Sequence, residues 1–226
     1  MSENDLVITR RRKKYKFAKF NKLGNCFQLK DWINSSQIRL LKGKKVIIEI
    51  GAGSALFLVS LAKLHPENFY IAVDIKSDRL YRGAKQATEE KIKNIVFIRS
   101  DIWQLTEIIS KNSVDEIWLT FSDPYPSKSD ARHRLTHPRF LEMYKNILRS
   151  NSKSSQLHFK TDSETLFGWS LEQFKENGWD IKNISRDLHN SDLPDEYKIM
   201  TTYEERFVSE GMVIYFADIE QFEVAE

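Results

Sequence analysis

Short apolar runs alternate with segments of helical spacing along this chain, and that alternation most strongly limits the folds open to it. Five runs rich in valine, isoleucine and phenylalanine predict buried strands: "KVIIEI", "FYIAVD", "NIVFIRSD", "VDEIWLTFSD" and "SQLHFKTD". Segments with helical periodicity, such as residues 76–92, 138–149 and 163–178, lie between or after them. Strands that alternate with helices favour a parallel sheet with helices on both faces.

The last third of the chain predicts two further strands, at residues 179–186 and 211–217. No clearly periodic helix separates them, so they can pair antiparallel at one edge, although "TTYEERF" between them suits a short helix. We therefore expect an α/β fold with a mostly parallel seven-stranded sheet, helices on both faces and an antiparallel edge strand. We find no repeat or internal linker, and expect a basic N-terminal extension over residues 1–30 and a single domain over residues 31–226.

The composition fits a globular protein of the cytoplasm. With 226 residues, 41% of them apolar, the chain can bury one sizeable core. No apolar run approaches the roughly 18 residues that span a membrane, and "MSENDLVITRRRKKYKF" lacks the apolar centre of a signal peptide. The single cysteine, Cys26, cannot form an internal disulfide, which suits a reducing compartment.

The positive charge is concentrated near the N-terminus. Residues 10–30 hold nine basic residues and no acidic one, whereas the net charge of the chain is only +3. Tyr15, Phe17 and Phe20 lie among these basic residues. Such a segment can neutralise phosphates while its rings stack or pack, although a solvated terminus has the same composition.

Acidic residues fall at or near the ends of the five predicted strands. Open α/β sheets bind ligands beyond the carboxyl ends of their strands. Any one of these acids could simply cap a helix, but five together predict a ligand or a cation at this edge. They are Glu49, Asp74, Asp101, Asp123 and Asp162.

A glycine turn in "EIGAGSALF" follows the first of these strands, and we expect Ser54 to cap the next helix. Gly51 and Gly53 allow a ligand to approach the backbone, but the third glycine of the dinucleotide fingerprint is missing. Asp74, 21 residues after Gly53, suits the ribose hydroxyls of NAD or of S-adenosylmethionine. The extra acid Glu49 would repel a pyrophosphate and attract a sulfonium and an ammonium, which favours S-adenosylmethionine. Asp101 would then accept from the exocyclic amine of adenine.

The loop "FSDPYPSKSDARHRL" places Asp123 opposite the glycine turn, where a methyl acceptor would meet the donor. Asp123 could act as general base, metal ligand or electrostatic partner, but no histidine or second acid has a suitable local spacing for a metal. Pro124 and Pro126 would stiffen the loop, and Tyr125 would offer a purine a stacking face or simply pack. A basic cluster fit for phosphates follows: Lys128, Arg132, His133, Arg134 and Arg139.

Motifs spread over nearly the whole chain resemble the bacterial tRNA (guanine-N7-)-methyltransferase family, which has the class I Rossmann-like methyltransferase fold. They are "RRRKK", "EIGAGSALF", "VDIK", "SDI", "FSDPYPSKSDARHRLTHPRFL", "LHFKTDSETLFGWSLEQF", "DLHNS" and "TTYEERFVSEG". The resemblance implies methyl transfer from S-adenosylmethionine, without a metal, to N7 of a guanine in the tRNA variable loop (position 46 in conventional tRNA numbering). It implies tRNA as partner and a monomer or homodimer.

The resemblance also implies roles for individual residues. Asp123 would be the catalytic acid and would line the S-adenosylmethionine site, and the substrate would meet Tyr125 and Lys128. Asp162 and the stretch Thr201, Thr202, Tyr203 and Glu204 would contact the guanosine or hold the catalytic loop. The other cofactor-binding residues would be Glu49, Gly51, Gly53, Asp74 and Asp101.

Three positions depart from the family pattern. Tyr125 stands where the family usually has tryptophan, and Asp74 where it usually has glutamate. Ser127 stands where the family usually has a lysine that contacts substrate, and Lys128 follows one residue later. Lys128 can replace that lysine if the loop shifts.

The implied chemistry suits these residues. Guanine N7 carries a free lone pair, so its methylation removes no proton beforehand, and a fixed carboxylate such as Asp123 can stabilise the cationic product. Three alternatives stay open. "DPYP" resembles the D-P-P-Y loops of enzymes that methylate exocyclic amines of RNA, and a tRNA-binding protein without turnover could keep the fold. An NAD-dependent oxidoreductase is disfavoured by an acidic cofactor cleft.

Overall fold

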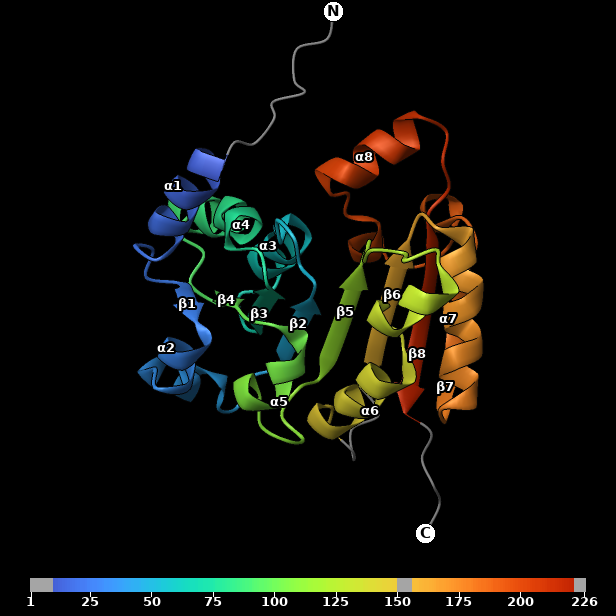
Figure 1. Cartoon of the computed structure of the whole chain (residues 1–226), viewed down its shortest axis with the longest axis horizontal. Coiled ribbons are helices and arrows are strands. Elements are labelled where there is room, and N and C mark those ends of the chain that lie inside the picture. Colours follow the sequence, from blue (N-terminus) through green and yellow to red (C-terminus); the bar gives the residue numbers. More distant parts are fainter. Residues whose placement is uncertain (1–9, 150–155, 222–226) are drawn as a thin grey trace, which may run out of the picture.

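A computed structural model describes residues 10–149 and 156–221, and these residues form an eight-stranded sheet with helices on both faces (Figure 1). The strand order is β1-β4-β3-β2-β5-β6-β8-β7, and only β8 runs antiparallel to its neighbours. The fold class is therefore confirmed. The strands are β1 (Cys26–Gln28), β2 (Val46–Ile50), β3 (Phe69–Asp74), β4 (Ile95–Arg99), β5 (Glu116–Thr120), β6 (Gln156–Thr161), β7 (Trp179–Ser185) and β8 (Tyr215–Gln221).

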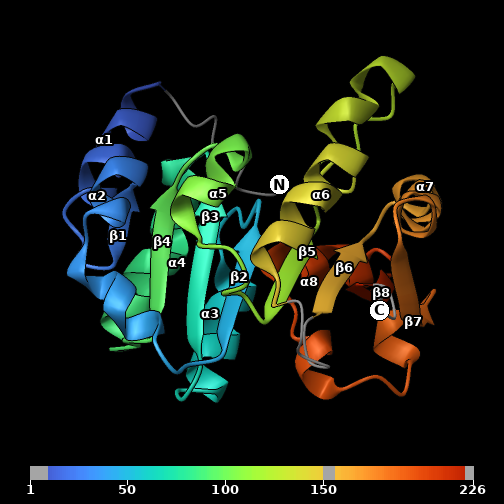
Figure 2. The ribbon, with the colours of Figure 1, turned by 90° about the horizontal axis from the view of Figure 1, so that it is seen from below.

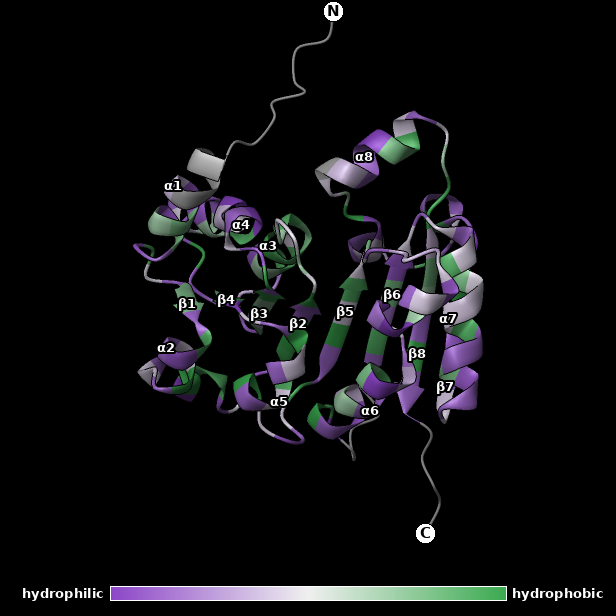
Figure 3. Cartoon of the chain, in the orientation of Figure 1, coloured by the Kyte–Doolittle hydropathy of each residue, from purple (hydrophilic) through white to green (hydrophobic). Residues whose placement is uncertain are grey.

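Two apolar cores lie on the two faces of the sheet. One core takes its helical residues from α2, α5, α6 and α7, and the other from α1, α3, α4 and, at its margin, α8 (Figure 2). Residues of the central strands β2 and β3 supply both cores, and the ribbon of these strands is coloured mostly hydrophobic in Figure 3, whereas that of α4 is largely hydrophilic. The helices are α1 (Arg10–Phe20), α2 (Leu29–Ile33), α3 (Leu56–Leu64), α4 (Ser77–Glu89), α5 (Leu105–Ile108), α6 (Pro138–Ile147), α7 (Glu164–Glu176) and α8 (Thr202–Ser209).

The sheet has one strand more than the seven expected, because β1 adds to the edge of β4 in parallel. Its sequence, "CFQ", is too short to give an apolar run. The expected boundary at residue 30 thus does not separate the N-terminal segment from the sheet. Phe20, at the end of α1, is also fully buried in the core.

The last two strands pair antiparallel, as expected, with β8 between β6 and β7. β8 begins at Tyr215, four residues later than the apolar run predicted. The segment "TTYEERF" contributes to α8, which opens with a capping box in which Thr201 and Glu204 each bond the other's backbone N–H. Among the described helices, none has the length and apolar character needed to cross a membrane.

Candidate active site

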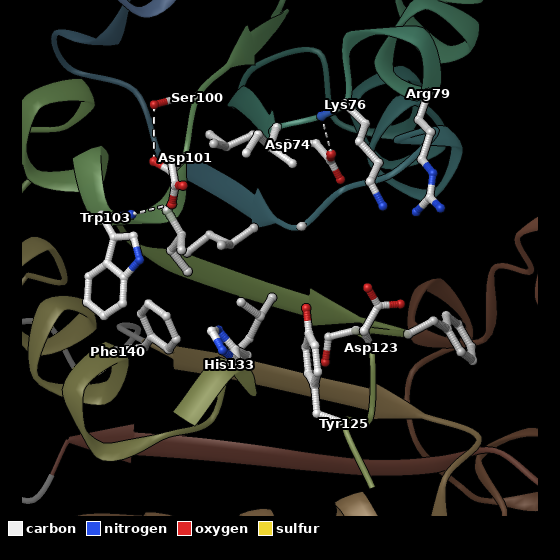
Figure 4. Close-up of a pocket in the computed structure, with 18 of the residues that line it drawn as sticks. Asp74, Lys76, Arg79, Ser100, Asp101, Trp103, Asp123, Tyr125, His133 and Phe140 are labelled. Atoms are coloured by element: carbon white, nitrogen blue, oxygen red, sulfur yellow. Dashed lines mark hydrogen bonds between the residues drawn. The ribbon is translucent and has the colours of Figure 1, made fainter. Parts of the chain in front are cut away.

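The carboxyl ends of β2, β3, β4 and β5 open into a cleft of about 330 Å³ (Figure 4). The side of the cleft opposite β3 and β4 is closed by the loop after β5 and by the start of α6. Five predicted site residues line this cleft, and three of them are strand-end acids. The five are Gly51, Asp74, Asp101, Asp123 and Tyr125.

Asp74 ties the glycine turn to the end of β3. Its Oδ2 accepts from the Gly53 N–H at 2.8 Å and its Oδ1 from the Lys76 N–H at 2.7 Å. Burial raises the pKa of Asp74, while these backbone donors oppose the rise. Each oxygen keeps a lone pair for a further donor, as binding to a ribose hydroxyl requires.

At the glycine turn the backbone borders the cleft without an intervening side chain. Gly51 and Gly53 have φ values of 72° and 53°, in the left-handed region that glycine adopts without strain. A Cβ on Gly51 would meet Leu135 Cδ1 at 2.9 Å, so any larger residue would have to displace the end of that side chain and strain the backbone. Ser54 does not cap α3, contrary to our expectation: the N-cap position is Ala55, in a left-handed conformation and without a side-chain cap bond.

Asp101 lies beside an apolar wall that we did not predict. Its Oδ1 caps the short 3-10 helix over residues 102–104 by accepting from the Trp103 N–H at 3.1 Å, and this leaves its other oxygen open to a ligand. Ile75 and Trp103 line the cleft although they are 53% and 48% exposed, and the Arg139 guanidinium lies 3.8 Å from the centre of a Trp103 ring. The signal in the sequence was an apolar residue one or two positions after a strand-end acid, as in "DIK" and "DIW".

Glu49 lies beneath the cleft rather than in its lining. The side chain is buried, and its Oε1 accepts a hydrogen bond from the Thr120 hydroxyl. Burial raises the pKa of Glu49 from 4.5 to about 8, and the charge of Asp74 contributes to the rise. Its Oε2 is buried without a hydrogen-bond partner among the described residues. Glu49 therefore keeps its proton to a higher pH than an exposed glutamate does.

The loop that carries Asp123 is strained on both sides of this residue. Phe121 and Tyr125 have φ values of 48° and 41°, which are rare for bulky residues. Asp123 is exposed, and in Figure 4 it projects with Tyr125 into the cleft across from Asp74 and Lys76. A conformation of this kind persists only where the surroundings enforce it, so this loop is a fixed part of the site.

The basic residues after this loop do not form one phosphate-binding cluster. Lys128 and Arg132 are exposed on a 3-10 helix over residues 128–133, outside the cleft lining. His133 and Arg139 line the cleft itself. Arg134 is buried and turned inward, so its inclusion among the phosphate contacts was wrong.

The remaining predicted substrate residues also lie outside the lining of the cleft. Asp162 directly follows β6 and is partly buried, and Thr201 caps α8. Tyr203 is 61% exposed, whereas Glu204 is fully buried and cannot reach a substrate in this arrangement. The side chain of Thr202 lies outside the described residues.

Glu204 is held by a buried lysine that sequence reasoning missed. Lys160 Nζ lies 2.6 Å from Glu204 Oε1 and donates to the Tyr197 carbonyl at 2.9 Å. His189 Nε2 lies 2.9 Å from the same Glu204 oxygen. Burial lowers the pKa of Lys160, against the pull of Glu204. The pair links β6 to α8, and a lysine inside the apolar run "QLHFK" was the only signal of it.

The charge of the cleft is balanced rather than acidic. Lys76, Arg79 and Arg139 line it together with the three aspartates. The argument that an acidic cleft would repel a pyrophosphate therefore loses most of its force. Within residues 10–149 and 156–221, no group of three or more histidine, cysteine, aspartate or glutamate side chains is placed to hold a metal.

Comparisons with known proteins identify the relatives of this chain. A family model described as "Putative methyltransferase" matches residues 43–217. A tRNA (guanine-N(7)-)-methyltransferase of Enterococcus faecalis (strain ATCC 700802 / V583) is 39% identical over 184 residues, or 81% of this chain and 84% of the relative. The enzyme of the same name from Macrococcus caseolyticus (strain JCSC5402) is 36% identical over 184 residues, or 81% of this chain and 82% of the relative.

A solved structure adds evidence on the fold alone. An antibiotic-related methyltransferase matches with a TM-score of 0.62 at 17% identity, over 82% of this chain and 92% of that chain. The sequence relatives match over most of both chains, and the matched residues 43–217 include the glycine turn, Asp123 and α8. The chain therefore belongs to the tRNA (guanine-N7-)-methyltransferase family.

Proposed function

We propose that this protein transfers the methyl group of S-adenosylmethionine to N7 of a guanine in the variable loop of tRNA. The observation that carries the proposal is Asp123, an exposed carboxylate on a strained loop that projects into the cleft across from Asp74 and Lys76. The family membership and the fold are consistent with it.

The residues present fit S-adenosylmethionine. Asp74 has free lone pairs for the ribose hydroxyls, and Asp101 has one oxygen free for the adenine amine. Ile75 and Trp103 offer apolar surface to the adenine ring, and Gly51 lets the amino acid end approach the backbone. Bound there, S-adenosylmethionine supplies an electrophilic methyl group on a sulfonium. The unpartnered Oε2 of buried Glu49 supports a nearby cationic ligand.

Methylation at N7 needs no general acid or base. The N7 lone pair of guanine forms a bond to the methyl carbon while the carbon–sulfur bond breaks, so the positive charge passes from sulfur to the purine ring. No proton leaves the base. Asp123 stabilises the charge that develops on the purine, and Tyr125 offers a face for stacking. Alignment of N7 with the methyl group supplies the rest of the acceleration.

The substrate contacts divide into direct and indirect ones. Exposed Tyr203 and Lys128 are available to RNA, and Asp162 lies at the strand end next to the Asp123 loop. Buried Glu204 acts through Lys160, which holds α8 in place, rather than by touching guanosine. Thr201 supports the same helix as its N-cap.

Neutralising the basic N-terminal segment is expected to weaken tRNA binding and to leave the affinity for S-adenosylmethionine unchanged. The change replaces residues 10–14, "RRRKK", with glutamine and leaves buried Phe20 in place. Each phosphate that the protein no longer neutralises should make the slope of log affinity against log salt shallower by about 0.9. Filter binding over a salt series measures this slope, and titration calorimetry measures S-adenosylmethionine binding. An unchanged tRNA affinity at low salt would contradict the role of the segment.

The pH dependence of cofactor binding is expected to report on Glu49. Its pKa of about 8 means that it gains charge as pH rises from 6 to 8, and that charge attracts a cationic ligand. The amino group of S-adenosylmethionine titrates in the same range, so Glu49→Gln is the reference. The ratio of the variant's Kd to that of the wild type should grow by about tenfold over these two pH units. A ratio that stays constant would show that Glu49 makes no charge contact with the ligand.

Unmodified tRNA transcript and methyl-labelled S-adenosylmethionine test the function directly. Label recovered in N7-methylguanosine would establish the reaction and the substrate together, and would show that Ser127 is tolerated. Label in an N2- or N6-methylated nucleoside would favour an exocyclic-amine methyltransferase. Tight binding of both ligands without label would favour a tRNA-binding protein without turnover. The cytoplasmic location and the choice between monomer and homodimer stay predictions.

A further inference from the structure

Arg134 lies behind the catalytic loop and bonds to its backbone. The side chain is buried, with only 5% of the residue exposed. Its Nε donates to the Pro124 carbonyl at 3.0 Å, and its Nη2 donates to the Tyr125 carbonyl at 2.9 Å. These are the two carbonyl groups that directly follow Asp123 in the chain. A single guanidinium thus fixes the two peptide units that follow Pro124 and Tyr125, directly beyond the catalytic residue.

The guanidinium is itself held in place by α7. Its Cζ lies 4.4 Å from the centre of the Trp169 ring, so the cation lies over the face of the indole. This cation–π contact helps to hold the guanidinium in place. Because Arg134 is buried and donates to the loop, it is not available to phosphates.

The hydrogen bonds from Arg134 are made to a strained part of the backbone. Tyr125 has a φ of 41°, a left-handed conformation that a tyrosine rarely adopts. The Tyr125 carbonyl receives Nη2 at 2.9 Å and Nε at 3.3 Å from the same arginine. Charge-assisted bonds to an oxygen of the strained residue are a direct way to enforce this conformation.

We propose that Arg134 is a positioning residue: it fixes the strained loop so that the Asp123 carboxylate faces the reacting purine. The proposal rests on the proposed methyl transfer and adds to it a residue that touches neither substrate nor cofactor. A displacement of about 1 Å at a reacting group can cost about 100-fold in rate. Loss of Arg134 should therefore lower kcat and leave ground-state binding nearly intact.

The test compares Arg134→Gln and Arg134→Lys with the wild type in the tRNA methylation assay. We expect kcat to fall by about 100-fold in R134Q, while KM for tRNA and Kd for S-adenosylmethionine stay within about threefold. Lysine keeps the charge but lacks the fork, so R134K should restore part of the lost kcat. If R134Q does not fold, R134K carries the test, with kcat expected to fall about tenfold at unchanged KM.

Arg149→Gln is the matched control for loss of stability. Arg149 pairs with Asp115 at 2.9 Å and donates to the Ser113 carbonyl at 3.3 Å, at the opposite end of β5. Its replacement removes similar bonds far from the cleft, so the thermal midpoint should fall while kcat stays unchanged below the transition.

The outcomes separate this proposal from the proposed function. An R134Q protein with the kcat of the active wild type would overturn the positioning role alone. A rise in KM for tRNA that depends on salt, at constant kcat, would also overturn it in favour of a phosphate contact. A wild-type protein that binds both ligands but forms no N7-methylguanosine would overturn the proposed function, and the positioning role with it.

Discussion

Replacing Asp123 with alanine is expected to abolish methyl transfer, with a fall in kcat of about 1000-fold or more. Asp123→Asn keeps the shape and removes only the charge, so it should retain little more activity than the alanine variant. Without this carboxylate, the positive charge that develops on the purine loses the anion that we place beside it. The residue is exposed, so neither variant should lose much stability.

The measurement is single-turnover methylation of tRNA transcript, together with separate titrations of tRNA and S-adenosylmethionine. Asp130→Asn is the control, because Asp130 is an exposed acid in the 3-10 helix that follows the same loop. That variant should keep the activity of the wild type. If D123N lost tRNA affinity as severely as it lost kcat, Asp123 would be a binding group and its catalytic assignment would fail.

The second large effect is expected in folding. Lys160→Met leaves Glu204 buried beside His189 but without its lysine, and a broken buried ion pair costs about 3–5 kcal/mol. The Tyr197 carbonyl also loses a donor. The free energy of unfolding from urea titration should therefore fall by that amount, and the helix α8 should lose its tie to β6.

Lys63→Met is the matched control for this experiment. Lys63 pairs with Glu90 at 2.8 Å, but the lysine side chain is 66% exposed, so its loss should cost less than about 1 kcal/mol. The double variant K160M/E204Q should recover part of the lost stability, because it leaves no unpaired buried charge. Equal effects of K160M and K63M would show that the buried pair contributes little.

The positions of the central strands could be predicted from the sequence alone. β2 and β3 coincide with the predicted apolar runs because both faces of these strands are buried, which leaves apolar residues at nearly every position. β1 was not predicted, because three residues at the edge of a sheet need no apolar run. We predicted the start of β8 too early, because the apolar run begins before the strand: residues 212–214 are apolar but lie outside it.

For the site, position along the strands was easier to predict than burial. Asp74, Asp101 and Asp123 reach one cleft because parallel strands end at the same edge of the sheet. The raised pKa of Glu49 and the burial of Arg134 depend on what packs around each side chain, and composition does not show this. For the same reason we predicted that the basic residues after Asp123 form one phosphate-binding surface, although some are exposed, some line the cleft and Arg134 is buried.

The docking of α1 has a consequence for how a guanine would be chosen. α1 packs against α4 and is anchored by buried Phe20, and β1 follows it into the sheet (Figure 1). A loose basic tail would only raise the local concentration of RNA near the protein. A helix packed on the catalytic domain would instead hold any phosphates bound along it at a set distance from Asp123. Selection of the target base would then depend on the folded shape of the tRNA more than on the letters next to the guanine.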